Sequence, residues 1–107
     1  MRLDECPVKA AIDAIGGKWK PLILRELKDS PRHFGELRRA IDGISHKVLT
    51  EQLRQLEDEG ILNRSVHRGK VVQTEYCLSE YGETLRPALT ALAAWGACHR
   101  EHRLVLS

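Results

Sequence analysis

Residues 43–62 read GISHKVLTEQLRQLEDEGIL, and this stretch decides how the chain folds. Leu49, Leu53 and Leu56 recur at the spacing of one helical face, which predicts an amphipathic helix with one buried stripe. The hydroxyl of Ser45 is positioned to cap the start of that helix. A glycine follows the last acidic residues and is expected to end it.

A second helical pattern lies immediately before this helix. Phe34, Leu37 and Ile41 are spaced as one face of a short helix, and Asp42-Gly43 is a turn dipeptide that ends it. Only a few residues separate the two helices. Two helices joined by a tight glycine-containing turn form a helix-turn-helix, whose second helix enters the major groove of DNA.

Helical patterns also occur before this motif. Pro7 begins a pattern of about nine residues that Gly16-Gly17 ends, and a second pattern runs from Trp19 to near Asp29-Ser30-Pro31. We therefore predict two helices ahead of the helix-turn-helix.

After the motif the hydrophobic period changes from 3.6 residues to about 2. Residues 62–66 and 72–78 are predicted to be the strands of a β-hairpin, and His67-Arg68-Gly69-Lys70 is predicted to be the turn between them. The hairpin therefore has a basic tip.

The last part of the chain returns to helical spacing. Five residues spaced four, three, four and three apart predict a long terminal helix: Leu85, Leu89, Leu92, Gly96 and His99. Ser79 is the candidate cap, and Pro87 is expected either to kink this helix or to mark its effective start. Gly96 lets another backbone come close to the helix.

Together these elements predict a mainly α fold with a small β-hairpin (α+β), a winged helix-turn-helix with an added terminal helix. A length of 107 residues leaves room for one domain, spanning 1–107. Aromatic residues make up only 5% of the chain, so the core is expected to be modest and mostly aliphatic. We therefore expect a homodimer, in which a second copy covers further apolar surface.

The charges on the second helix of the motif run against its own dipole. His46 and Lys47 stand at its amino end, where the dipole favours anions, whereas Glu57, Asp58 and Glu59 stand at the other end. A phosphate group outside the chain would explain this order. The formal net charge of +2 is too small to indicate a polyanionic partner by itself.

The residues expected to contact double-stranded DNA share a cationic or hydrogen-bonding side chain on the motif or the hairpin. They are Arg38, Arg39, Ser45, His46, Lys47, Thr50, Arg54, Arg64, Arg68 and Lys70. His46 and Lys47 can donate to guanine edges, and Thr50 can contact a thymine methyl or donate. The alternatives are a merely hydrated surface, or a winged helix that serves protein contacts without binding DNA.

Other classes of function find little support in the sequence. Cys98, His99 and His102 lie close together, but without a second cluster they fit no ordinary closed zinc site, so neither a metal nor another cofactor is predicted. No glycine-rich oxyanion turn or orienting acid accompanies the cysteines, and no enzymatic activity is expected. The chain also lacks an apolar run of membrane-spanning length and a signal-peptide segment, which predicts a cytoplasmic protein without a membrane partner.

Motifs along nearly the whole chain match a known pattern. They are Cys6-Pro7, IGGKW (15–19), HFGELRRAIDGIS (33–45), KVLTEQLRQLEDEGIL (47–62), Arg64, EYCLSEYGETL (75–85) and Trp95-Gly96. In these segments the chain resembles the HxlR-type branch of winged helix-turn-helix transcription regulators, relatives of the MarR group. The resemblance implies a homodimeric DNA-binding regulator whose first and last helices form the dimer interface, with Ser45, Lys47 and Thr50 on the recognition helix. One departure is the hairpin, which reads HRGKVVQTEY where family members often have a Val-Pro-containing turn.

The resemblance also bears on the three cysteines, Cys6, Cys77 and Cys98, which a reducing compartment would keep as thiols. Many family members carry an oxidant- or electrophile-responsive thiol at the place of Cys6. The amino-end dipole of the first helix can raise its thiolate fraction, and Asp4 and Glu5 act in the opposite direction. If the first and last helices of two subunits meet, Cys6 of one subunit could form a bridge with Cys98 of the other. The alternative is that Cys6 only packs at the interface, and Cys77 is expected to be structural.

Overall fold

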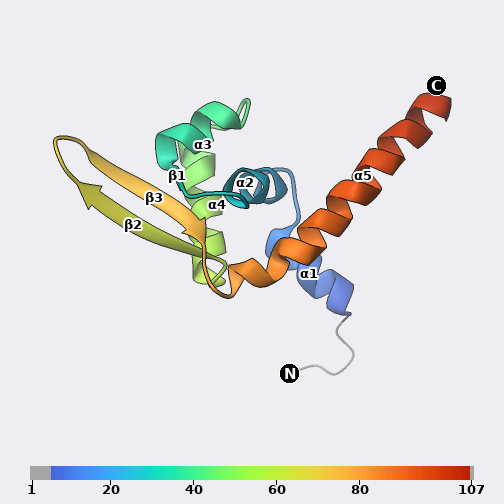
Figure 1. Ribbon diagram of the computed structural model, residues 1–107, viewed down its shortest axis with the longest axis horizontal. Helices are drawn as coiled ribbons and strands as arrows, with labels where there is room; N and C mark the ends of the chain where they lie inside the picture. The colour runs from blue at the N-terminus through green and yellow to red at the C-terminus, as the bar shows by residue number, and fades with distance from the viewer. Residues whose placement is uncertain (1–5, 107) are drawn as a thin grey trace.

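The computed structural model describes residues 6–106, and its elements follow the predicted order (Figure 1). They are α1 (Pro7–Ile15), α2 (Lys20–Leu27), β1 (Arg32–His33), α3 (Phe34–Ala40), α4 (His46–Asp58), β2 (Leu62–Arg68), β3 (Val72–Leu78), a 3₁₀ helix (Gly82–Leu85) and α5 (Arg86–Leu106). The β2–β3 hairpin extends from one end of the molecule and α5 from the other. The predicted fold class, mainly helical with a small antiparallel sheet, is confirmed.

The core forms where α2, α3 and α4 meet. Leu49, Leu53 and Leu56 of α4 are completely buried, as their spacing predicted. They pack in one cluster with buried residues of α2 and α3. The Ser45 hydroxyl accepts a hydrogen bond from the backbone N–H of Val48 at 3.1 Å, which confirms the predicted cap. The opposite face of α4 is therefore held outward.

The sheet has three strands in the order β1-β3-β2, all antiparallel. Strand β1 was not predicted, because a two-residue strand carries no detectable period. The predicted turn at 67–70 was wrong, since His67 and Arg68 belong to β2 and pair with Gln73 and Val72. The hairpin is solvent-exposed at this end, so its ladder continues there without the apolar alternation that marks a half-buried strand.

The connection from β3 to α5 depends on Ser79. Its hydroxyl donates to the carbonyl of Gly60 and accepts from the backbone N–H of Gly82 at 2.9 Å, so Ser79 supports the 3₁₀ helix rather than capping α5. A Cβ atom on Gly82 would lie 2.1 Å from the Ile61 carbonyl oxygen, so only glycine fits there. Pro87 is the second residue of α5 and marks the start of that helix, one of its two predicted roles.

We expect Ser79→Ala to lower the free energy of unfolding by about 1–3 kcal/mol, because it removes the side-chain partner of the buried Gly82 N–H and of the partly buried Gly60 carbonyl. Urea denaturation of the purified protein measures this difference. Ser65→Ala, at an exposed position of β2, is the matched control and should change the midpoint very little. Equal midpoints for the two variants would contradict the assigned role of Ser79.

Candidate nucleic-acid interface

The exposed face of α4 carries the residues that the sequence singled out. Ser45, His46, Lys47, Thr50 and Arg54 are all exposed. The first turn of α4 contains no acidic residue. No carboxylate of that turn therefore balances the positive end of the helix dipole. This end of the helix is therefore suited to an external anion.

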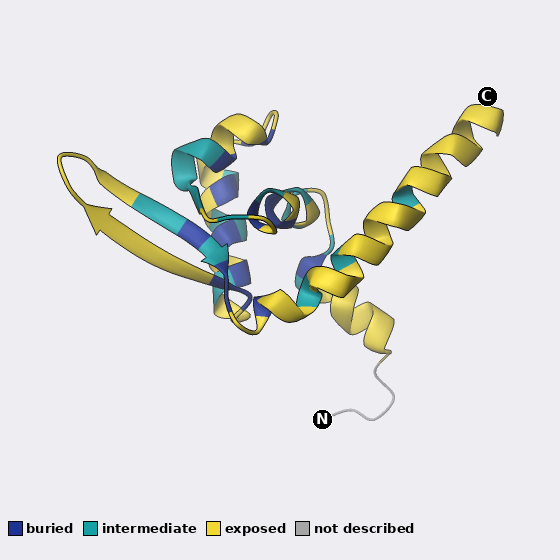
Figure 2. Cartoon of the chain, in the orientation of Figure 1, coloured by how far each residue is buried: buried dark blue, intermediate teal, exposed yellow. Residues whose placement is uncertain are grey.

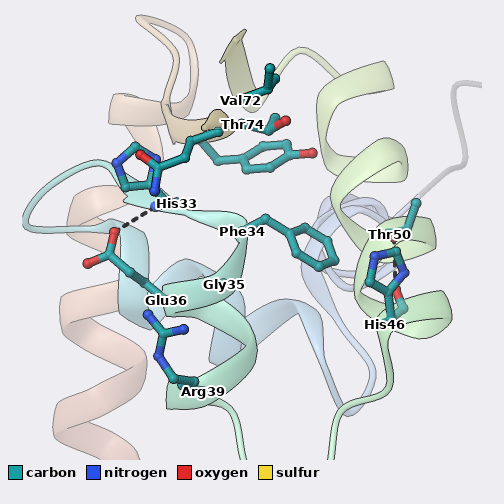
Figure 3. Close-up of a pocket in the computed structure, with 11 residues that line it drawn as sticks. His33, Phe34, Gly35, Glu36, Arg39, His46, Thr50, Val72 and Thr74 are labelled. Carbon is teal, nitrogen blue, oxygen red and sulfur yellow. Dashed lines mark hydrogen bonds between the residues drawn. The ribbon is translucent and has the colours of Figure 1, made fainter. Parts of the chain in front are cut away.

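Two contacts from neighbouring helices fix the orientation of α4. The ammonium group of Lys20, on α2, donates to the side-chain oxygens of Gln52 and Gln55 at 3.0 and 2.6 Å. At the amino end, the ring of Phe34 packs against the ring of His46 with centroids 4.8 Å apart (Figure 3). Phe34 thus packs against the tip of α4, and Lys20 binds the helix further along.

The hydroxyl of Thr50 donates to the backbone carbonyl of His46 at 2.8 Å. A hydroxyl has one hydrogen to donate, so Thr50 keeps its acceptor lone pairs and its methyl group for an external contact. Of the two roles predicted for Thr50, contact with a thymine methyl agrees better with this geometry than donation.

A hollow of about 450 Å³ separates the amino end of α4 from the hairpin. Its lining includes Phe34 and Arg39 from α3, His46 and Thr50 from α4, and Val72 and Thr74 from β3 (Figure 3). An adjoining cleft brings Arg38 to the same place, beside Arg39 and His46. The structure thus gathers four of the predicted residues, Arg38, Arg39, His46 and Thr50, around connected hollows.

Val72 and Thr74 were not singled out in the sequence. The hairpin register pairs Val72 with Arg68 and Thr74 with Val66. Side chains alternate along a strand, so these residues share a face with Tyr76, which is buried. The alternation of side chains along β3 would have identified both residues as lining the hollow if the position of the strand beside α4 had been known.

The other predicted cations lie elsewhere on the surface. The Arg64 Nε atom is 3.5 Å from the Glu57 carboxylate, near the carboxyl end of α4. Arg68 ends β2, and Lys70 lies in the turn at the hairpin tip, away from the helices (Figure 1). Arg54 is exposed on the third turn of α4. For these four residues, as for the other six, contact with DNA stays a prediction.

Two ionisable groups at the hollow have shifted pKa values. A backbone hydrogen bond from His33, 2.8 Å from the Glu36 carboxylate, lowers the pKa of Glu36. Its contribution to stability is therefore present at neutral pH and is lost as pH falls below the usual carboxylate range. Burial raises the pKa of Tyr76, so its phenol remains neutral at physiological pH.

A second feature of the surface is the apolar face formed by α1 and α5. Within the described residues, no residue of α5 is buried, and α1 buries only Ile15 (Figure 2). The side chains of Ile12, Leu92 and Trp95 are 59%, 57% and 66% exposed. The two helices border a largely apolar groove of about 650 Å³. Large exposed apolar surfaces of this kind mark interaction sites.

The three cysteines are unpaired thiols. Cys6 is exposed at the position before the first residue of α1, and Cys98 is exposed on α5, while Cys77 is partly buried in β3. Asp4 and Glu5, expected to oppose thiolate formation at Cys6, lie outside the described residues.

Three further observations concern the rest of the molecule. Within residues 6–106, no three His, Cys, Asp or Glu side chains gather in a way that could hold a metal ion. On α5, His99 stacks on the Trp95 ring with centroids 5.0 Å apart. None of the helices between residues 6 and 106 is long and apolar enough to cross a membrane.

Comparison with known proteins gives consistent results. The family model described as HxlR-like helix-turn-helix matches residues 14–103. An uncharacterized HTH-type transcriptional regulator from Methanothermobacter thermautotrophicus is 43% identical over 98 residues, which are 92% of this chain and 75% of the relative.

Solved structures agree with this match. The reduced form of the redox regulator HypR superposes with a TM-score of 0.87 at 37% identity, covering 94% of this chain and 99% of HypR. A MarR-family structure from Porphyromonas gingivalis superposes with a TM-score of 0.81 at 32% identity, covering 91% of this chain and 95% of that one.

Proposed function

The chain belongs to the HxlR-like helix-turn-helix family of transcriptional regulators, and on that premise we propose that it is a homodimer that binds operator DNA sequence-specifically through α4. One observation carries the proposal. The exposed amino end of α4 has cationic and hydrogen-bonding side chains and no acidic residue in its first turn, although its own dipole favours negative charge there. Phosphates of a duplex supply that charge.

In this proposal the side chains divide into two groups. His46, Lys47 and Thr50 meet base edges in the major groove, because residues at the start of a recognition helix reach furthest into it. The arginines of α3 and the basic residues of the hairpin contact phosphates, which position the protein without reading sequence. Arg68 is the residue we expect to reach the neighbouring minor groove or backbone.

The exposed apolar face of α1 and α5 supports the dimer. A helix of 21 residues without a buried side chain gains little from tertiary packing in a single subunit, and tertiary packing is the main source of helix stability in proteins. A second copy related by twofold symmetry would cover the same face on both subunits. Such a dimer presents two copies of α4 to successive major grooves on one side of the duplex.

The proposed function is tested by a mobility-shift titration on the DNA upstream of the protein's own gene, at two salt concentrations. Binding should weaken steeply as salt increases, because each phosphate contact releases counterions. Unrelated DNA should bind more weakly at both concentrations. A winged helix that makes only protein contacts would bind neither DNA and show no salt dependence.

We further propose that Cys6 is an oxidant-sensitive thiol. Its exposed position before α1 and the similarity to HypR, a redox regulator solved in reduced and oxidised forms, support this role. If α1 and α5 of two subunits pack together, Cys6 and Cys98 can form a disulfide between subunits. Two thiols then lose two electrons and two protons to the oxidant.

The Cys6→Ser variant tests this role. After treatment with diamide, we expect the unmodified protein to form a covalent dimer on non-reducing electrophoresis and to change its DNA affinity. Cys6→Ser should remain a monomer band with unchanged affinity, because it lacks the attacking thiol. Cys77→Ser, at a partly buried position, should still cross-link. Monomer bands for all three proteins would contradict the bridge.

A further inference from the structure

Three ionisable side chains from the three strands meet beside the hairpin. The Nε2 atom of His67, on β2, is 3.3 Å from one carboxylate oxygen of Glu75, on β3. The Nε2 atom of His33, on β1, is 3.9 Å from the other oxygen. The two imidazole rings stand almost perpendicular, with centroids 6.1 Å apart. One carboxylate therefore lies between two histidines.

The position of this cluster connects the hairpin to the helix-turn-helix. His33 directly precedes α3, and its backbone pairs with Glu75 in the sheet. His67 and Glu75 lie on the two arms of the hairpin. The His33–Glu75 contact therefore ties β3 to the start of α3, and the His67–Glu75 contact ties the two arms of the hairpin together.

We propose that Glu75 is a positioning residue whose contact with protonated His67 holds the hairpin for DNA binding, so that affinity for DNA rises as pH falls from about 8 to about 6. This inference rests on the proposed function. Histidine is the ordinary side chain that changes charge in this range. An imidazolium donates a charge-assisted hydrogen bond to a carboxylate, which is stronger than the bond from a neutral ring.

The surroundings accommodate a positive charge better at His67 than at His33. His67 has 56% of its side chain exposed, so its charged form remains hydrated. The Nδ1 atom of His33 is buried, and the described residues offer it no hydrogen-bond partner. A second proton on that ring would be buried without an acceptor, which disfavours the charged form.

Other charged groups near the cluster come from β1 and α3. The Glu36 carboxylate accepts a hydrogen bond from the His33 backbone, and Arg32 and Arg39 act electrostatically on Glu36. The lowered pKa of Glu36 keeps this carboxylate ionised between about pH 6 and about pH 8. We call the cluster of His33, His67 and Glu75 the clamp. Protonation of His67 is then the change in charge within it.

DNA binding by fluorescence anisotropy at about pH 6 and about pH 8, at constant ionic strength, tests the clamp. The unmodified protein should bind about threefold to tenfold more tightly at the lower pH. His67→Gln and Glu75→Gln should lose most of this difference. His102→Gln is the matched control, since it removes an exposed histidine of α5, at the other end of the molecule from the hairpin (Figure 1). It should keep both the affinity and the ratio.

The outcomes separate the clamp from the proposed function. DNA binding with the same affinity at both pH values, or a full pH response in His67→Gln, overturns the clamp and leaves DNA binding standing. Failure to bind any DNA at either pH overturns the proposed function and, with it, the regulation inferred here. In the free protein, Glu75→Gln should shift the imidazole NMR signals of His67 and leave those of His99 unchanged. Unchanged His67 signals would also count against the clamp.

Discussion

Lys47→Glu should lower the affinity for operator DNA at least about thirtyfold while the melting temperature of the protein stays the same. A contact to a base edge is worth about 1–3 kcal/mol, and a dimer has two half-sites, so the combined loss is about 2–6 kcal/mol. The acidic group also repels neighbouring phosphates. Lys47 is exposed on α4, so the fold does not depend on it. Anisotropy and thermal unfolding measure the two quantities.

Arg100→Glu is the matched control for charge. It changes the net charge by the same amount, at an exposed position of α5 on the other side of the molecule from the hairpin (Figure 1). The affinity of this variant for operator DNA should fall only slightly, because the lost positive charge weakens the long-range attraction between protein and DNA. Similar losses for the two variants would show that general attraction, and not a contact at the tip of α4, carries the binding.

Leu92→Glu should convert the dimer to monomers at micromolar concentration and reduce DNA affinity to near the non-specific level. Leu92 is 57% exposed in a single subunit, so an acidic side chain there stays hydrated and the subunit can fold. In a symmetric interface two carboxylates would be buried without partners, which costs several kcal/mol. Sedimentation or light scattering gives the oligomeric state.

Ala97→Glu is the matched control on the same helix. Five residues at about 100° each turn Ala97 to the side of α5 away from Leu92. This exposed position should accept the acid without loss of the dimer. If Leu92→Glu remains dimeric while Ala97→Glu dissociates, the interface lies on the other side of α5.

Spacing along the chain was sufficient to predict the α-helices and the presence of a hairpin, but not the residues of its turn or the 3₁₀ helix. Residues close in sequence determine two features of α4. These are the buried stripe of Leu49, Leu53 and Leu56 and the cap formed by Ser45. Strand β1 could not be predicted, because a strand of Arg32 and His33 exists only through its pairing with β3.

The same limit applies to the candidate site. The exposed residues of α4 followed from its period, and the structure gathers some of them with α3 around the hollow. The contact of Phe34 with His46 depends on the angle between two helices, and the meeting of His33, His67 and Glu75 depends on the register of three strands. Neither quantity is encoded by neighbouring residues, so tertiary structure was needed to find these contacts.

Under the proposed function, the exposure of most of α5 in a single subunit has a consequence for gene control. When subunits are scarce relative to the dimer dissociation constant, the amount of dimer varies with the square of their concentration. Halving the supply of the protein then removes about three quarters of the dimer available to operators. Expression level would thus set promoter occupancy more steeply than for a regulator that binds as a monomer.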